Sequence, residues 1–113
     1  MIVSGGENID SAEVENVMMK HPDIADVAVF GVPDSQWGET VRACVVLKQA
    51  SELRQDLEAS GIEIVAWIRD HLAHFKCPRR VDFVEQIPRS PSGKILKRIL
   101  REPYWRNEDR QIH

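Results

Sequence analysis

Hydrophobic and polar positions near the start of the chain predict a hairpin followed by a helix. Apolar residues on either side of the polar segment 4–8 are typical of a short hairpin or hooked loop. Asp10, with Glu13 three residues later, is a capping-box sequence that predicts the start of a helix, and His21 and Pro22 would end it. The buried stripe of this helix is predicted to contain Val14, Val17 and Met18.

The middle of the chain alternates between strand-like and polar segments. Residues 26–32 and 40–48 are rich in β-branched and apolar side chains, which predicts two strands, the first of them ending at Pro33. Residues 49–60 are polar and predict a loop with a short helical turn. Residues 81–84 predict a third strand.

Two further helices are predicted in the second half. Ser60 and Glu63 form a second capping-box sequence, and Pro78 would close the helix that follows it. The last helix is predicted to begin at Lys94 and to stop at Pro103. The buried face of the earlier helix would consist of Ile64, Ile68, Leu72 and Phe75.

These elements predict an α+β fold with one hydrophobic core. The expected architecture is a small mixed β-sheet, with about three main strands plus a short N-terminal hairpin, flanked by about three helices. A length of 113 residues with 42% hydrophobic content is ordinary for one compact domain. We therefore predict a domain over residues 1–102 and a polar C-terminal tail over residues 103–113.

The composition of the chain indicates the cellular compartment in which the protein would be found. The chain contains no apolar run near the roughly 20 residues that span a bilayer, and it does not open with a signal-peptide pattern. Cys44 and Cys77 are far apart and outside any metal-ligand spacing, which favours buried free thiols in a reducing compartment. We expect a cytoplasmic protein without a membrane span.

Charge is distributed unevenly along the chain. The net charge is −3, but residues 1–75 carry 5 basic and 13 acidic side chains, whereas residues 76–113 carry 10 basic and 5 acidic ones. A basic end favours an anionic partner, although the two halves could equally neutralise each other within the fold. Four basic residues at helical spacing form a ridge that is either a solvated face or a phosphate contact: Lys94, Lys97, Arg98 and Arg101.

The segment Pro88–Lys94 is the strongest candidate for chemistry. Its two prolines and one glycine restrict the loop, and Gly93 allows a sharp turn directly before the lysine. Such a loop can present the Lys94 ammonium to an anionic partner. The alternative is that Lys94 is an ordinary solvated surface lysine.

Two glycines and two aromatic residues are further candidates. Gly5 and Gly6 either allow close approach to a ligand or form a plain hairpin turn. Trp37 and Phe75 either cap the core or stack on a flat ligand ring. Positive charge for phosphates would come from Lys76, Arg79 and Arg80. The four histidines show no paired spacing, so no metal site is predicted.

Several of these motifs, in order, resemble the C-terminal domain of acyl-CoA synthetases. That family belongs to the adenylate-forming superfamily, which also includes firefly luciferase and peptide synthetase adenylation domains. The resemblance covers about residues 1–102. It is carried by residues 1–9 and 13–15, His21-Pro22, residues 29–34, Trp37-Gly38-Glu39, Phe75-Lys76-x-Pro78 and Pro88-x4-Gly93-Lys94-Ile95.

The resemblance implies roles in two half-reactions. Lys94 matches the family's catalytic lysine, which acts when a carboxylate attacks the α-phosphorus of ATP to give acyl-adenylate and pyrophosphate. The loop that lines the pantetheine tunnel during thioester formation with CoA is matched by Gly5, Gly6 and Glu7. Positions that hold the CoA nucleotide in some relatives are matched by Trp37, Phe75 and Lys76.

Two positions depart from relatives. Cys77 stands where some relatives have an arginine, which removes one expected phosphate contact. Gly5 stands where luciferase-like members carry a lysine, which disfavours a luciferase.

The resemblance also implies a missing partner. The ATP loop, the acyl pocket and most Mg²⁺ contacts belong to a large N-terminal domain of the same enzyme, and its motifs are not found in this sequence. The chain is therefore expected to be a fragment or excised domain that meets CoA and acyl-adenylate but does not adenylate alone. The alternatives are a stand-alone CoA- or nucleotide-binding module and a basic polyanion-binding module without catalysis; nucleic acid is not the expected partner.

Overall fold

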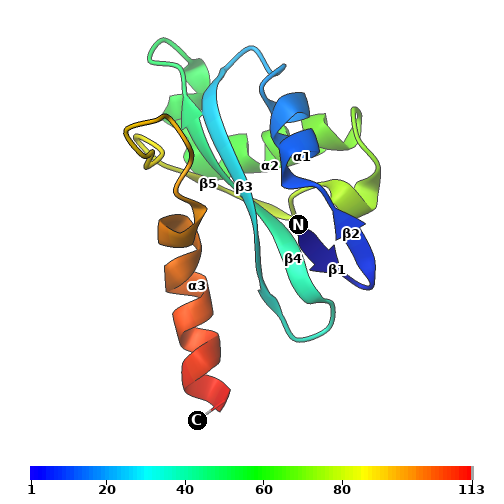
Figure 1. The fold of residues 1–113 in the computed structure, drawn as a ribbon. Coiled ribbons are helices and arrows are strands. Elements are labelled where there is room, and N and C mark those ends of the chain that lie inside the picture. Colours follow the sequence, from blue (N-terminus) through cyan, green and yellow to red (C-terminus); the bar gives the residue numbers. More distant parts are fainter. Residues whose placement is uncertain (113) are drawn as a thin grey trace.

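A computed structural model gives the structure of the protein, describing the backbone of residues 1–112 and the side chains of residues 1–106. Two strand hairpins and a single strand are separated by helices along the chain (Figure 1). The strands are β1 (Ile2–Ser4), β2 (Glu7–Ile9), β3 (Ile24–Asp34), β4 (Gly38–Leu47) and β5 (Arg80–Phe83). The α-helices are α1 (Ser11–Met18), α2 (Leu57–Arg69) and α3 (Lys97–Ile112), and the 3₁₀ helices are η1 (Glu52–Gln55) and η2 (His74–Lys76).

The sheet is mixed and is built around β4. Strands β3 and β4 form a long antiparallel hairpin, and β5 pairs with β4 in parallel. The β1–β2 hairpin joins β4 antiparallel through Ser4 and Gly38. This confirms the predicted α+β fold with a mixed sheet, an N-terminal hairpin and three helices.

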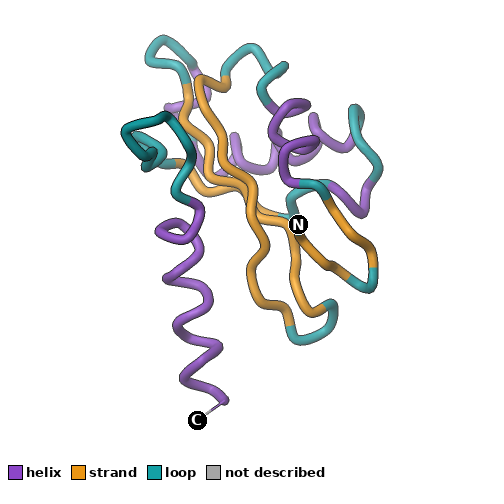
Figure 2. Tube along the Cα trace, in the orientation of Figure 1, coloured by secondary structure: helices purple, strands orange, loops and turns teal. Residues whose placement is uncertain are grey.

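Helices cover both faces of the sheet (Figure 2). Because side chains alternate along a strand, Val27 and Val29 of β3 pack into the main core with α1 and α2. Phe30 and Val32 point the other way and pack with Leu100 of α3. One sheet therefore separates a large core from a smaller one under α3.

Two of the predicted helix starts have different outcomes. Asp10 caps α1, its carboxylate accepting the Ala12 N–H at 2.9 Å. The second capping box is wrong: α2 begins at Leu57 and is capped by Asp56. Ser60 lies inside α2, where its hydroxyl donates to the carbonyl of Leu53 at 2.7 Å.

The predicted ends of α2 and of the first long strand also need correction. Helix α2 ends at Arg69, so Phe75 is half-exposed in η2 instead of lying on the buried face. Strand β3 continues through Pro33. Side chains at the outer edge of β3 bind the N–H groups of Val27 and Val29, so odd-numbered N–H groups point away from β4. The N–H that Pro33 lacks would lie at this edge, and its absence costs no ladder bond.

Pro103 does not stop the last helix, which continues to Ile112. Contacts of the two residues directly after Pro103 hold α3 on the sheet. The Tyr104 hydroxyl donates to Asp82 at 2.5 Å, and the Trp105 indole donates to the Gly31 carbonyl at 3.0 Å. Tertiary packing thus outweighs the local cost of an interior proline.

His21 gives the fold a pH dependence. It is only 6% exposed, its Nδ1 accepts the Asp23 N–H at 3.0 Å, and its ring meets Trp67 edge-on. Burial lowers the pKa of His21 below its ordinary value, with the field of Asp23 opposing that shift. As pH falls, the unfolded chain therefore takes up a proton at this position before the folded chain does, and stability falls as pH drops below about 6.5.

We expect the urea concentration at the midpoint of unfolding to decrease when the pH is lowered from 7.5 to 5.5. His21→Gln removes the titration, so its midpoint should change less over this range. His74→Gln, at an exposed histidine, is the control and should behave like the parent chain. Parallel pH profiles for all three proteins would contradict this account.

Candidate functional site

The Lys94 loop is a tight hairpin. Arg89 and Ile95 form an antiparallel bridge, and the Gly93 N–H donates to the Ser90 carbonyl at 2.8 Å. Gly93 has φ +89°, the conformation that follows a type I turn in a three-residue hairpin loop. The Ser90 N–H then donates to the Lys94 carbonyl at 2.8 Å and closes the loop. The predicted turn at Gly93 is confirmed.

The Lys94 side chain is exposed. Among the described residues, its ammonium forms no ion pair with a carboxylate. It lines a concavity of about 680 Å³. The other lining residues are Arg89, Ile95, Leu96, Lys97, Arg98 and Ile99. This surface is strongly basic and leaves Lys94 free to meet an anion.

The predicted basic ridge is only partly free. Lys97 lies 3.1 Å from the Glu15 carboxylate, and Arg101 lies 3.9 Å from that of Glu39. Half of the ridge is therefore neutralised by other elements of the fold. The ridge is therefore not a continuous row of unpaired cations that could bind a polyanion.

A second cavity, of about 190 Å³, brings together four of the predicted residues: Gly5, Glu7, Trp37 and Phe75. Trp37 is 39% exposed and Phe75 is 48% exposed, so both rings can be reached from solvent. The Arg79 guanidinium lies 5.4 Å from the centroid of the Trp37 ring and also lines the cavity. Aromatic faces beside a cation suit a flat, phosphate-bearing group.

Gly5 has a different physical role from Gly6. A Cβ on Gly5 would lie 2.8 Å from Trp37 Cε3, whereas a Cβ on Gly6 would meet nothing within 4 Å. Gly5 also donates its N–H to the Trp37 carbonyl at 2.9 Å. Gly5 therefore seats the tryptophan, and open space lies next to Gly6.

We expect Gly5→Ala to destabilise the protein by about 1–3 kcal/mol and to displace the Trp37 ring, because it combines a φ of +57° with a steric clash. Gly6→Ala, at φ +84°, adds backbone strain alone and is the matched control. Urea unfolding and the NMR signal of the Trp37 indole would measure both effects. An unmoved indole in Gly5→Ala would contradict the seating role.

Lys76 does not line this cavity, and Cys77 lines it only as a buried residue. The Lys76 ammonium lies 2.9 Å from the Glu13 carboxylate. This ion pair engages Lys76, which was predicted to contact CoA, and Glu13, which was predicted to complete a capping box with Asp10. That capping box is therefore not formed. Cys77 is buried, and burial raises the pKa of its thiol. Neither cysteine forms a disulfide, as predicted.

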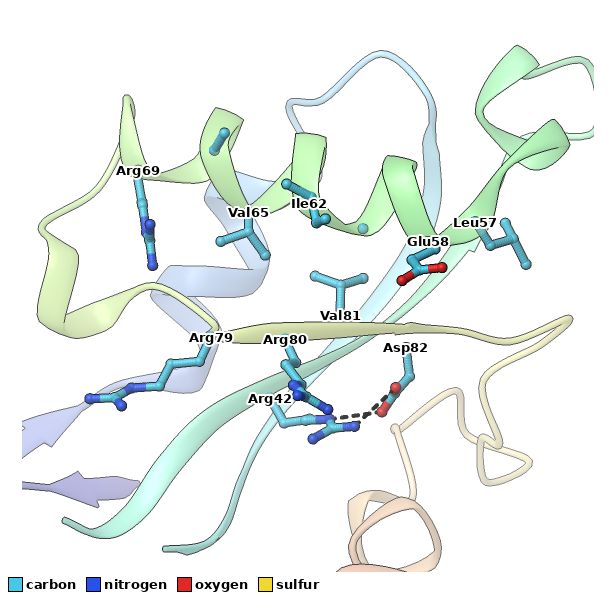
Figure 3. Close-up of a pocket in the computed structure, with 12 residues that line it drawn as sticks. Arg42, Leu57, Glu58, Ile62, Val65, Arg69, Arg79, Arg80, Val81 and Asp82 are labelled. Atoms are coloured by element: carbon cyan, nitrogen blue, oxygen red, sulfur yellow. Dashed lines mark hydrogen bonds and ion pairs between the residues drawn. The ribbon is translucent and has the colours of Figure 1, made fainter. Parts of the chain in front are cut away.

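A third concavity, of about 500 Å³, lies between α2 and β5 (Figure 3). Val65 and Val81 face each other across it, whereas Arg42, Arg80 and Asp82 lie on the other side of β5. Arg42 is held by Asp82 at 2.8 Å. Arg79 lines both this groove and the Trp37 cavity, so the two basic surfaces are continuous.

Sequence analysis named Arg79 and Arg80 but missed Arg69, which also lines the groove. Helix α2 packs against β5 at Gly61, where an added Cβ would be in van der Waals contact with Phe83 at 3.6 Å. No local pattern reveals that packing. The Lys94 hairpin belongs to neither concavity and lies on the opposite side of the sheet from the β1–β2 hairpin in Figure 1.

Comparisons with known proteins agree with this architecture. The chain is 47% identical over 104 residues to the long-chain-fatty-acid–CoA ligase FadD13 of Mycobacterium tuberculosis, matching 92% of this chain and 19% of that protein. It is 45% identical over 105 residues to the probable acyl-activating enzyme 22 of Arabidopsis thaliana, matching 89% of this chain and 20% of that protein. The crystal structure of a Brucella canis acyl-CoA synthetase superposes with a TM-score of 0.84 at 36% identity, covering 95% of this chain and 19% of that one.

Fold and sequence together define a domain of the adenylate-forming enzymes. The chain belongs to the AMP-binding enzyme C-terminal domain family, which it matches over residues 13–94. It spans about a fifth of the length of these relatives. None of the helices in the described part of the chain is long and apolar enough to cross a membrane.

Proposed function

We propose that this chain is the C-terminal domain of an ATP-dependent carboxylate–CoA ligase and that Lys94 is its adenylation lysine. The observation that carries the proposal is an exposed lysine, free of carboxylate partners among the described residues, directly after the turn of a hydrogen-bonded hairpin in a member of this family. The N-terminal domain of the same enzyme is the partner that would supply the ATP and acyl sites.

In the first half-reaction, negative charge gathers where the substrate carboxylate approaches the α-phosphate of ATP. An ammonium on a long flexible stem can donate to oxygens of both groups as the new bond forms and pyrophosphate leaves. The described residues contain no cluster of three or more His, Cys, Asp or Glu side chains for a metal ion. Following the family resemblance, we assign the Mg²⁺ that accompanies ATP to the N-terminal domain.

In the second half-reaction, CoA attacks the acyl-adenylate, and the cavity at Trp37 is our candidate for its nucleotide. Trp37 and Phe75 offer ring faces, and Arg79 offers a cation next to them. The pantetheine arm would pass through the open space beside Gly6 and along the exposed Glu7. Lys76 could join only after leaving Glu13.

A domain exchange tests this proposal with a defined substrate. The C-terminal domain of FadD13 would be replaced by this chain, and the chimera would be given a long-chain fatty acid, ATP and CoA. Formation of acyl-adenylate and then acyl-CoA is expected. A folded chimera that binds ATP yet forms no adenylate would contradict the proposed function.

A further inference from the structure

Two carboxylates, one from β3 itself and one from α1, bind N–H groups at the outer edge of β3. Asp26 Oδ1 accepts the Val27 N–H at 2.9 Å, and Glu15 Oε2 accepts the Val29 N–H at 2.8 Å. Each carboxylate is therefore fixed in position by the backbone of the sheet. Neither is a loose surface charge.

Each of these carboxylates also binds a cation that flanks Lys94. Arg89, five residues before it, donates to both Asp26 oxygens at 2.7 and 2.8 Å. Lys97, three residues after it, lies 3.1 Å from Glu15 and donates to the Ser11 hydroxyl at 2.8 Å. The hairpin is thus attached to the sheet edge on both sides of the lysine.

Arg89 also acts inside the hairpin. Its other terminal guanidinium nitrogen donates to the Gly93 carbonyl at 2.9 Å. This carbonyl belongs to the peptide group that joins Gly93 to Lys94. One side chain therefore joins the sheet edge to the backbone next to the lysine. A guanidinium can do this because it carries donors in several fixed directions.

The Arg89–Asp26 and Lys97–Glu15 pairs also neutralise part of the positive charge around Lys94. Arg89, Lys97 and Arg98 share the concavity with Lys94. Asp26 and Glu15 neutralise the first two, and a carboxylate that already has a cationic partner attracts Lys94 less strongly. Partly exposed ion pairs contribute little to global stability, so their effect is expected to be local.

We propose that the Arg89–Asp26 and Lys97–Glu15 pairs form a clamp that fixes the direction of Lys94, and that Arg89 is a positioning residue for adenylation. The claim that the clamp assists adenylation rests on the proposed function. The claim that it restricts the motion of the hairpin does not. A reacting group displaced by about 1 Å can lose about 100-fold in rate, so holding the hairpin is a direct contribution to catalysis.

The clamp is tested first on the chain itself, without any assay of activity. ¹⁵N relaxation would give backbone order parameters for Gly93 and Lys94 in the parent chain, Arg89→Ala and Arg89→Lys. Arg106→Ala, which breaks the i,i+4 pair with Glu102 on α3, is the matched control. We expect the Lys94 value to fall from about 0.85 to below about 0.6 in Arg89→Ala, partly recover in Arg89→Lys and stay unchanged in Arg106→Ala.

Urea unfolding separates a local effect from a global one. The midpoint of Arg89→Ala should shift no more than that of Arg106→Ala. An unchanged order parameter at Lys94 would overturn the clamp. So would a large loss of global stability accompanied by equal loosening throughout the domain.

The FadD13 chimera then tests the catalytic meaning. Arg89→Ala should lower kcat for adenylation by about 10-fold or more with KM for ATP nearly unchanged, and Arg89→Lys should restore part of it. Full activity in a chimera whose hairpin has loosened would overturn the positioning role. If Lys94→Ala also leaves adenylation intact, the proposed function fails instead, and the relaxation result still decides the clamp.

Discussion

Lys94→Ala in the FadD13 chimera is expected to lower the rate of acyl-adenylate formation by about 100-fold or more. The substitution removes the ammonium from a surface where the described residues give it no carboxylate partner, so no structural ion pair is lost. What is lost is a charge aimed at oxygens whose negative charge increases in the transition state. Pyrophosphate release in single-turnover mixing experiments would measure this rate.

Two controls give the result its meaning. Lys20→Ala removes another exposed lysine, at the end of α1, and should leave the rate unchanged. Thioester formation from supplied acyl-adenylate should survive in Lys94→Ala, because the Trp37 cavity does not contain Lys94. Equal loss of both half-reactions would argue against separate sites.

Ending the chain at Glu102 is expected to destabilise the domain by about 3–5 kcal/mol, as removal of a large packed aromatic residue does. Tyr104 packs with Phe30 in the second core, at 5.9 Å between ring centroids, and its ring carries the Arg42 guanidinium at 4.9 Å. Burial and the hydrogen bond to Asp82 raise the pKa of Tyr104 to about 12, so this contact persists at physiological pH.

Urea or thermal unfolding of the shortened chain would measure this cost. Tyr104→Phe keeps the ring and removes only the hydroxyl, so it should cost about 1 kcal/mol. An unchanged midpoint for the shortened chain would support the domain boundary at residue 102 that sequence analysis predicts. A large shift would move that boundary into α3.

Local signals in the sequence were sufficient for much of the fold. Asp10 stands directly before an amphipathic stripe, and Gly93 stands where a hairpin loop requires a positive φ, so both were predicted correctly. Ser60 misled because an equally good cap, Asp56, lies one turn earlier, and helix starts are decided by which cap the packing selects. Pro103 misled because contacts with distant strands hold α3 together.

The candidate site was predictable in its residues but not in its connections. The motifs around Trp37 and Lys94 identify side chains, and the structure places four of the predicted ones around one cavity. The pairing of Lys76 with Glu13 joins elements far apart in sequence, so neither residue's local pattern indicates it. Arg89 and Asp26 are 63 positions apart, and only the arrangement of the sheet brings them together.

The side chains along the outer edge of β3 have a consequence for behaviour in solution. Asp26, Glu15 and the Trp105 indole satisfy main-chain groups there, and Pro33 offers none to donate. An edge on which several main-chain groups are already bound by side chains is a poorer template for strand addition by another molecule. This edge can therefore face water with less tendency to self-associate than an unprotected edge strand would have.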